Sequence, residues 1–386
     1  MITTKAWVLH QAQGAGAAEP LADRLREESF RFDDLSAEEV LVEPLYGCWE
    51  GNMSHAVERD PIDICRQRRE ERVVIGNAGV VRVLRPGADV RSLREGDLCM
   101  VFCNGVADER GYPEKIYAYD APGTIGLLAR RTKLHQRQLI RIPDGSRLSL
   151  QQWAAFSLRY VTAWANWHAA HGCWRALSGE ETPPGVWGWG GGVSYAQLTL
   201  ATLLGCPATM ISSDLNRIGL IETSRIEAVD RREFPHLAFD PEAYAADASF
   251  KERYFASEKQ FLRLVEERTG GRGVDIFIDF IGLPVYRATL KALARPGVIT
   301  TAGWKEGMLL STVRALECMH WHTHVHTHYA RYDQALAAIA FAEENAWAPP
   351  REEEPHRWED VPKLAVAHVR GEISSFYPVY EINPPS

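Results

Sequence analysis

The order of apolar and polar positions along the chain predicts two kinds of structure. In residues 1–148, short runs of β-branched and apolar residues alternate with turn clusters, which predicts a β-rich region. Residues 150–170 follow a helical period, and Ser149 before them is a suitable N-cap. In residues 185–302, strand patterns alternate with helices of roughly ten residues, which is typical of a parallel, doubly wound sheet. A last short strand is expected at 376–382.

These patterns predict an α/β chain with two domains, of which the first is discontinuous. A length of 386 residues fits this number, at about 150 residues per domain. We expect a β-rich domain made of 1–150 and 346–386, and a doubly wound domain made of 151–345. Residues 236–256 interrupt the alternation and indicate an insertion, whereas 348–355 has the composition of a linker.

Composition and charge exclude several classes of protein. Hydrophobic residues make up 46% and charged residues 24% of the chain, which excludes a disordered or collagen-like protein. The net charge of −8, without a long Lys/Arg block, argues against a nucleic-acid partner. No apolar run reaches the ~18 residues of a membrane span, and no signal-peptide pattern opens the sequence. Seven scattered cysteines favour a reducing, cytoplasmic location over a disulfide framework.

A glycine-rich turn lies between the first strand and the first helix of the doubly wound region. Glycines let the backbone approach a phosphate, and a helix N-terminus offers N–H groups and the positive end of its dipole. Ser194 stands where the usual pattern has its last glycine, so the strand–turn–helix context carries the prediction. A purely structural turn, with Trp189 packed over the sheet end, is the alternative. The residues predicted to hold a dinucleotide pyrophosphate are Gly188, Trp189, Gly190, Gly191, Gly192 and Val193.

The end of the second strand of that sheet selects between NAD and NADP. The spacing places Ser213 at this point, with Asp214 and Arg217 after it. Serine and arginine favour the 2′-phosphate of NADP, whereas Asp214 favours the ribose 2′-hydroxyl of NAD. We predict NADP(H), with NAD(H) as the alternative. The ends of the fourth and fifth strands add four predicted cofactor positions: Phe280, Ile281, Ala302 and Gly303.

Several segments together resemble the medium-chain dehydrogenase/reductase superfamily. They are Lys5–His10, Pro86–Asp97, Leu139–Asp144, Thr162-Ala163-Trp164, Gly273–Asp279 and Pro296–Ile299. The resemblance implies a GroES-like β-rich domain joined to a Rossmann domain, Thr162 beside the nicotinamide, and a homodimer. The chain is more similar to the crotonyl-CoA carboxylase/reductase (enoyl reductase) branch, on four segments: Val186-Trp187-Gly188, Ser194-Tyr195-Ala196, the insertion at 236–256 and Pro113–Asp120.

Zinc-dependent members of this superfamily hold a catalytic zinc with three protein ligands, which leaves a fourth position open. Cys48 stands at the first ligand position. Gly76-Asn77-Ala78 and Leu158-Arg159-Tyr160-Val161 stand at the other two, without a histidine or cysteine. One ligand of three does not hold the metal, so we expect a zinc-independent protein. Hydride addition to a conjugated C=C needs no metal, because a neighbouring thioester or ketone accepts the charge.

Histidines recur at every second position from His320 to His328, which would place all five on one face of a strand. Such a run is either part of a late strand that leads to the substrate or, as His-x-His, a metal site. The resemblance makes His324 or His328 a candidate proton donor, since imidazole titrates near neutral pH.

Other positions carry candidate catalytic groups. Glu50 lies close to Cys48, where metal-dependent relatives keep a serine or threonine relay, although a solvated turn would also explain it. Tyr119 and Asp120 depend on the branch resemblance, and a surface loop is their alternative. Cys48 is a candidate nucleophile, but the sequence places no base beside it.

The sequence therefore predicts a reductase that transfers hydride from NADPH to the conjugated C=C of a small molecule, either an enoyl thioester or an enone. A dehydrogenase/reductase acting at C–O, with Glu50 or Tyr119 as acid and base, is one alternative. A non-catalytic family member is the other. The carbon-dioxide-binding asparagine of the branch is replaced by Cys48, which argues against reductive carboxylation.

Overall fold

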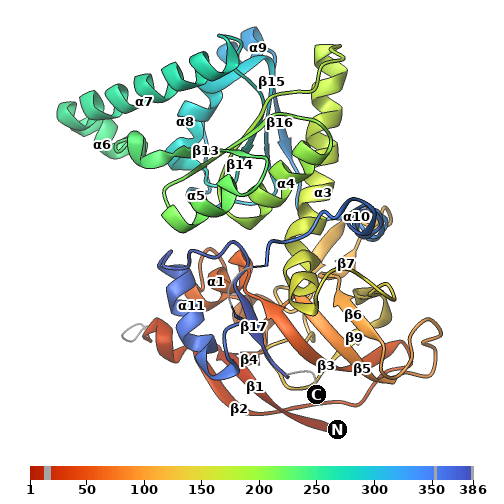
Figure 1. Ribbon diagram of the computed structural model, residues 1–386. Helices are drawn as coiled ribbons and strands as arrows, with labels where there is room; N and C mark the ends of the chain where they lie inside the picture. Colours follow the sequence, from red (N-terminus) through yellow and green to blue (C-terminus); the bar gives the residue numbers. More distant parts are fainter. Residues whose placement is uncertain (13–18, 352–353, 384–386) are drawn as a thin grey trace. The chain divides into compact units, whose positions relative to one another are not determined.

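The computed structural model describes residues 1–12, 19–351 and 354–383 and contains two compact units (Figure 1). Unit 1 comprises Met1–Val161 and Arg331–Ser386, and unit 2 comprises Thr162–Ala330.

The unit boundaries differ from the expected 150 and 345. The first boundary falls inside the long helix α3 (Leu150–Ser178), and α10 (Tyr332–Asn345) belongs to unit 1. The reason for the second difference is packing: the Tyr332 ring lies edge-on to Phe102 at 5.4 Å. At the other end of α10, the Ser146 hydroxyl donates a hydrogen bond to Glu343.

Unit 1 is built from antiparallel strands, as the sequence predicts for its β-rich part. One sheet has the order β10-β6-β5-β3-β17, with β9 also paired to β3; a second has the order β2-β1-β4, and β7 pairs with β8. The strands are β1 (Ile2–His10), β2 (Leu25–Phe32), β3 (Glu39–Cys48), β4 (Arg72–Val73), β5 (Gly79–Pro86), β6 (Leu98–Val101), β7 (Asn104–Ala107), β8 (Pro113–Ile116), β9 (Thr132–His135), β10 (Leu139–Arg141) and β17 (Val379–Glu381). The helices are α1 (Gly51–Glu58), α2 (Ile64–Arg68), α10 and α11 (Val361–Val369), with 3-10 turns at Leu21–Asp23, Gln136–Gln138 and Trp358–Asp360.

Strand β17 joins the end of the chain to the middle of unit 1. It pairs antiparallel with β3, and Tyr380 lies opposite Gly47. The Tyr380 ring occupies the space that a side chain at position 47 would need, so only glycine fits there. This pairing places residues 376–380 beside Cys48, which is the last residue of β3.

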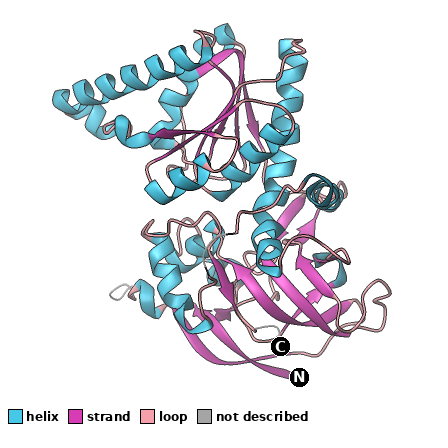
Figure 2. Ribbon diagram, viewed as in Figure 1, coloured by secondary structure: helices cyan, strands magenta, loops and turns pink. Residues whose placement is uncertain are grey.

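Unit 2 is the predicted parallel sheet, in the order β13-β12-β11-β14-β15-β16 and flanked by helices (Figure 2). Its strands are β11 (Val186–Trp189), β12 (Ala208–Ser212), β13 (Glu227–Asp230), β14 (Val274–Asp279), β15 (Leu293–Thr301) and β16 (His322–His326). Its helices, besides the end of α3, are α4 (Gly192–Leu203), α5 (Leu215–Glu222), α6 (Pro241–Ala246), α7 (Ala248–Thr269), α8 (Leu283–Ala292) and α9 (Arg314–His320), with a 3-10 turn at Arg231–Glu233. In the described part of the chain, no helix combines the length and the apolarity needed to cross a membrane.

The insertion expected at 236–256 is largely helical. Asp240 caps α6 by accepting from Glu242 N and Ala243 N, and Asp247 caps α7 by accepting from Ser249 N. The second cap starts α7 at Ala248, inside the segment that the sequence indicates as an insertion. Both units therefore have the fold class that the sequence predicts, and the errors concern where elements begin.

Candidate active site

The glycine turn in unit 2 connects β11 to α4 at the carboxyl end of the parallel sheet. Gly190 has a φ of +123°, and a Cβ at this position would lie 2.8 Å from the Ser194 hydroxyl oxygen and 3.1 Å from Phe280 Cβ. Ser194 Oγ donates to the Trp189 carbonyl at 2.6 Å, so the residue that replaces the usual glycine closes the turn. Among the described side chains none caps α4, and its first turn begins with Gly192 and Val193. The turn therefore suits close approach of a phosphate to the backbone.

Trp189 contributes only its backbone to this turn. Its side chain is buried, stacks on Phe277 at 5.7 Å and lies 5.2 Å from Phe261. The indole Nε1 donates to Thr289 Oγ1 at 2.8 Å. The side chain thus packs into the core beside the sheet, in line with the packing alternative for this tryptophan.

Asp214 and Arg217 lie after the end of β12, at the start of α5. The Asp214 carboxylate accepts from the backbone N–H groups of Asn216 and Arg217, at 2.9 and 3.0 Å, and so caps α5. The carboxylate therefore already has a structural role at the start of this helix. Ser213 and the Arg217 side chain remain as the predicted phosphate-binding groups at this strand end.

Two charged residues near the carboxyl ends of the strands were not singled out from the sequence. Arg231 follows β13 and is half-buried, and burial lowers its pKa. Asp279 ends β14, and burial raises its pKa to about 6. Its Oδ1 accepts from Ile281 N at 2.9 Å and Gly282 N at 3.0 Å, which shapes the turn at the predicted positions 280 and 281. The available signal was a charged residue at the end of a strand (Asp279) or directly after one (Arg231).

Asn166 of α3 ties the last two strands together, and it too was missed. Its Oδ1 accepts from Gln197 Nε2 at 2.8 Å and Thr300 Oγ1 at 3.0 Å. Its Nδ2 donates to Thr301 O at 3.1 Å and Thr327 Oγ1 at 2.8 Å. Both acceptor sites and both donors of this buried amide are used. The bonds hold the strand ends next to Ala302 and Gly303, and the signal was an asparagine among apolar residues of the helix that also carries the buried Thr162.

The histidine run does not form one strand, so the expectation that all five share a face is wrong. His320 ends α9, and Trp321 turns the chain with a φ of 58°. Only His322, His324 and His326 lie on β16. His320 belongs to the preceding helix, in which side chains at every second position do not share a face. His324 lies in the middle of the strand and contacts Glu317 and Tyr286. His328 is exposed and lies beyond the carboxyl end of β16, and it is thus the candidate nearer the strand ends.

In unit 1, Glu50 forms a buried ion pair with Arg159. Arg159 Nε lies 2.8 Å from Glu50 Oε2, and both side chains are at most 8% exposed. The guanidinium also donates to the carbonyls of Trp49, at 2.6 Å, and Phe376. Burial raises the pKa of Glu50, while Arg159 and the Cys48 side chain oppose the rise. Glu50 therefore does not lie in a solvated turn and is not a free general base, because its carboxylate neutralises a buried cation.

Polar atoms that lack partners gather around this pair. Glu50 Oε1, the Asn77 amide and the Tyr380 hydroxyl are buried and make no hydrogen bond to described residues. Burial and the neighbouring Cys48 and Glu50 raise the pKa of Tyr380. Unpaired buried groups are uncommon in folded proteins and often mark a functional site. Asn77 and Tyr380 are therefore candidate site residues that the sequence interpretation did not include.

The residues at the three zinc-ligand positions do not suit a zinc ion. Cys48 is a usual ligand, but Asn77 is not, and the third region contributes the cation Arg159. No cluster of three or more His, Cys, Asp or Glu residues able to hold a metal ion occurs among residues 1–12, 19–351 and 354–383.

Tyr119 and Asp120 lie in a tight turn after β8. Asp120 Oδ1 accepts from Ile116 N at 2.6 Å, and Tyr119 N donates to Ile116 O at 3.2 Å. Burial raises the pKa of Tyr119 to about 12. These contacts stabilise the turn itself, in line with the loop alternative.

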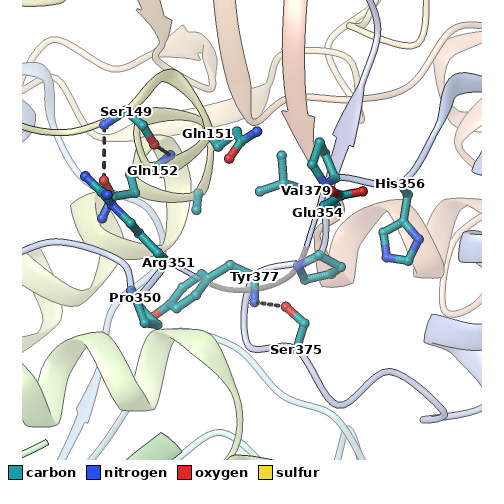
Figure 3. Close-up of a pocket in the computed structure, with 13 residues that line it drawn as sticks. Ser149, Gln151, Gln152, Pro350, Arg351, Glu354, His356, Ser375, Tyr377 and Val379 are labelled. Carbon is teal, nitrogen blue, oxygen red and sulfur yellow. Dashed lines mark hydrogen bonds between the residues drawn. The ribbon is translucent and has the colours of Figure 1, made fainter. Parts of the chain in front are cut away.

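Unit 1 contains a cavity of about 370 Å³ between the start of α3 and the segments around residues 350–356 and 375–379 (Figure 3). Tyr377 lines it, and the ring of Tyr377 also lies 5.6 Å from the Arg159 guanidinium. The other labelled side chains in the view are polar for the most part, and they include Ser149, Gln151 and Gln152 from the start of α3. Tyr377 thus separates the buried charge from an open, polar cavity.

The chain was compared with family models, with curated proteins and with solved structures. No family model matches the chain. A curated crotonyl-CoA reductase from Streptomyces avermitilis is 25% identical over 276 residues, which cover 69% of this chain and 58% of the relative. The chain thus spans somewhat more than half the length of that curated relative.

Solved structures share the fold of the whole chain. A 2-octenoyl-CoA carboxylase reductase, CinF, in complex with NADP and 2-octenoyl-CoA has a TM-score of 0.83 at 18% identity, covering 100% of this chain and 88% of that one. The crotonyl-CoA carboxylase/reductase AntE in complex with NADP has a TM-score of 0.79 at 19% identity, covering 100% and 96%. The chain is thus similar in sequence to a crotonyl-CoA reductase, and it shares with these solved structures the predicted fold of a GroES-like domain and a Rossmann domain.

Proposed function

We propose that the protein is an NADPH-dependent reductase that adds hydride to the conjugated C=C of an enoyl thioester. The observation that carries the proposal is the turn at Gly190, where a φ of +123° and the closeness of Ser194 and Phe280 leave room for backbone only. Such a turn before a helix is the usual place for a dinucleotide pyrophosphate. Support for the substrate class comes from the curated crotonyl-CoA reductase and from the solved relative that holds 2-octenoyl-CoA.

Different residues of unit 2 would bind the different parts of the cofactor. The backbone of 188–193 would hold the pyrophosphate, and Ser213 and Arg217 the 2′-phosphate. Thr162, with Phe280, Ile281, Ala302 and Gly303, would lie along the nicotinamide half. NADPH, when bound, supplies the hydride. His328 would donate a proton to the α-carbon, and Asn166 would keep the strand ends beside it in place.

The alternative reaction at C–O has less support. It requires Glu50 or Tyr119 as acid and base, but Glu50 neutralises Arg159 and Tyr119 belongs to a turn. A homodimer and a cytoplasmic location remain predictions. The edge strand β16 and the exposed apolar side chains of Met308, Leu309 and Met319 support the homodimer.

The direct test is consumption of NADPH or NADH with crotonyl-CoA, 2-octenoyl-CoA, a simple enone and a ketone as substrates. Oxidation of NADPH that depends on an enoyl thioester is expected. Faster turnover of the ketone would favour chemistry at C–O, and failure to bind either nucleotide would support a non-catalytic protein.

Arg217→Ala should raise the KM for NADPH by about tenfold or more, since a charge-assisted hydrogen bond contributes ~1.5–3 kcal/mol. The KM for NADH should not change, because NADH lacks the 2′-phosphate. Initial rates with each nucleotide measure both values. Arg225→Ala is the matched control, because Arg225 is an exposed arginine beyond the other end of α5. An equal rise in KM for NADH and NADPH would mean that Arg217 does not recognise the 2′-phosphate.

His328→Gln should lower kcat for crotonyl-CoA reduction about 100-fold, the lower range for a lost proton donor. The dissociation constant for NADPH should stay the same. Stopped-flow absorbance of NADPH measures the first quantity and tryptophan quenching the second. His326→Gln, an exposed histidine on the same segment, is the control. A similar fall in kcat for both variants would argue for a general effect on the strand. An unchanged kcat in H328Q would mean that water, and not His328, protonates the substrate.

A further inference from the structure

The end of strand β13 carries a cation that the proposed function does not use. Arg231 is the first residue after β13, and Ser213 is the first residue after β12. The two strands are parallel neighbours, with Ser212 paired to Asp230. Ser213 and Arg231 therefore follow side by side at the carboxyl edge of the sheet, about one strand spacing of ~4.8 Å apart. The second residue thus lies next to the predicted 2′-phosphate position.

The guanidinium of Arg231 has no partner among the described residues. No hydrogen bond or ion pair joins it to another of them, although the side chain is half-buried. A partly desolvated cation without a counter-charge is unfavourable in a folded protein. The adjacent arginine shows the usual arrangement, because Arg232 Nε lies 2.9 and 3.0 Å from the two carboxylate oxygens of Asp230. A bound anion would stabilise Arg231 in the same way.

The donors of Arg231 are within reach of a ligand. Among the arginines that the structure describes, side-chain nitrogen atoms that are both sealed from solvent and unpaired occur in Arg59, Arg68 and Arg331. None of the nitrogen atoms of Arg231 belongs to this group. Arg231 is therefore held partly within the protein while its guanidinium stays open to a ligand.

The carboxylates near these strand ends do not form an ion pair with Arg231. Asp214 caps α5, and Asp230 caps the 3-10 turn after β13. Asp279 accepts from two backbone N–H groups of the turn that follows it, and Glu306 is exposed. The charges of Glu306 and Asp279 oppose the fall in the pKa of Arg231 that burial causes, but neither group contacts it. Since Asp279 ends β14, this attraction indicates that the guanidinium lies along the carboxyl edge, where a dinucleotide binds.

A 2′-phosphate suits this arrangement better than a 2′-hydroxyl does. A phosphate monoester carries close to two negative charges at neutral pH, and a planar guanidinium can donate two parallel hydrogen bonds to its oxygens. Arg217 lies in the first turn of α5, so it would approach such a phosphate from the helix, and Arg231 from the neighbouring strand. The neutral ribose hydroxyl of NAD would give Arg231 no counter-charge.

We propose that Arg231 is a second ligand of the 2′-phosphate and that it selects NADPH over NADH together with Arg217. The inference rests on the proposed use of NADPH and names a residue that sets this preference. The Arg231 guanidinium donates two hydrogen bonds to the phosphate, which supplies its counter-charge. Ser213 lies between the two arginines and donates its hydroxyl to the same group.

Isothermal titration of the full chain with 2′,5′-ADP and 5′-AMP tests the inference, because these two probes differ only in the 2′-phosphate. The unmodified protein should bind 2′,5′-ADP at least about tenfold more tightly than AMP. Arg231→Met removes the charge and should weaken 2′,5′-ADP about tenfold or more, with no change in the affinity for AMP. Arg231→Lys should restore part of the difference, since it keeps the charge without the planar fork.

Arg225→Met is the matched control. Arg225 is exposed and precedes the same strand, at the amino edge of the sheet, so this variant should bind both probes as the unmodified protein does. Phosphorus-31 spectra of 2′,5′-ADP bound to the unmodified protein give a readout that requires no variant. The second pKa of the bound 2′-phosphate should lie below its free value of about 6, because neighbouring guanidinium groups favour the dianion.

The outcomes separate this inference from the proposed function. If neither the probes nor NADPH bind, both are wrong. If the unmodified protein prefers 2′,5′-ADP and R231M keeps the whole preference, only the inference is wrong, and Arg217 remains as the phosphate ligand. Equal weakening of both probes in R231M would place Arg231 against the adenosine or its 5′-phosphate, which contradicts the inference. A 2′-phosphate whose pKa does not fall on binding would contradict it as well.

Discussion

Arg159→Met should lower the free energy of unfolding by about 3–5 kcal/mol, the range for a buried ion pair that loses one partner. The variant leaves the Glu50 carboxyl in a buried environment without the cation 2.8 Å away. It also removes the donors to the Trp49 and Phe376 carbonyls. Urea unfolding followed by tryptophan fluorescence measures the change.

The pH dependence of this loss identifies its cause. Burial raises the pKa of Glu50, and removal of the guanidinium takes away the main opposing effect. A carboxyl whose folded-state pKa exceeds its unfolded-state value binds its proton more tightly in the folded protein. The variant should therefore regain stability below the unfolded-state pKa and lose it as the pH rises through the folded-state pKa. A deficit that is the same at every pH would mean that lost packing, and not the buried charge, dominates.

Two comparisons complete this test. The double variant R159M/E50Q should recover much of the loss, since a buried pair replaced as a whole by uncharged groups is often close to neutral. Arg141→Met removes one partner of the exposed Arg141–Asp144 pair and should change the stability by less than about 1 kcal/mol. A double variant no more stable than R159M would contradict the ion-pair account.

Gly190→Ala should raise the dissociation constant for NADPH at least tenfold and lower the stability by about 1–3 kcal/mol, the cost of a strained backbone position. The φ of +123° is unfavourable for alanine, and its Cβ would meet Ser194 Oγ and Phe280 Cβ. Either the turn shifts or Ser194 loses its bond to the Trp189 carbonyl. Both changes displace the backbone that would hold the pyrophosphate. Fluorescence titration with NADPH and thermal unfolding measure the two effects.

Gly191→Ala tests whether the turn depends on the conformation of Gly190 or only on having several glycines. A Cβ at position 191 has nothing within 4 Å, and its φ of −111° lies outside the left-handed region. Its thermal stability should therefore match that of the parent protein. Equal destabilisation by both substitutions would show that the turn depends on flexibility and not on the conformation of Gly190.

The sequence predicted the parallel sheet well because each of its strands is a local pattern followed by a turn. The strands from β11 to β15 alternate with helices, as the pattern of residues 185–302 predicts. The histidine run failed for a local reason. A period of two continues from His320 into β16, but it cannot reveal that a helix ends at His320 and turns at Trp321.

The candidate site was harder to predict, because its decisive contacts join residues far apart in the sequence. Glu50 was singled out as a catalytic candidate, but its partner Arg159 lies on another element and was considered only as part of a missing zinc site. Asn166 meets Gln197, Thr300 and Thr327 only after the sheet has formed. Asp214 counted as an argument for NAD in the sequence, which does not reveal its capping contacts. Residue type indicates which chemistry is available, whereas the three-dimensional contacts decide whether it is already in use.

The pairing of β3 with β17 also sets an order for folding during synthesis. Cys48 leaves the ribosome more than three hundred residues before Val379, its partner in the sheet. Until then, the wall of unit 1 formed by residues 376–380 is missing, and the Arg159 guanidinium lacks its acceptor at Phe376. Unit 2 needs no residue beyond Ala330 and can close first. A nascent chain that has completed unit 2 therefore still carries an open, partly charged unit 1 until residues 376–380, which help to bury the ion pair, have been made.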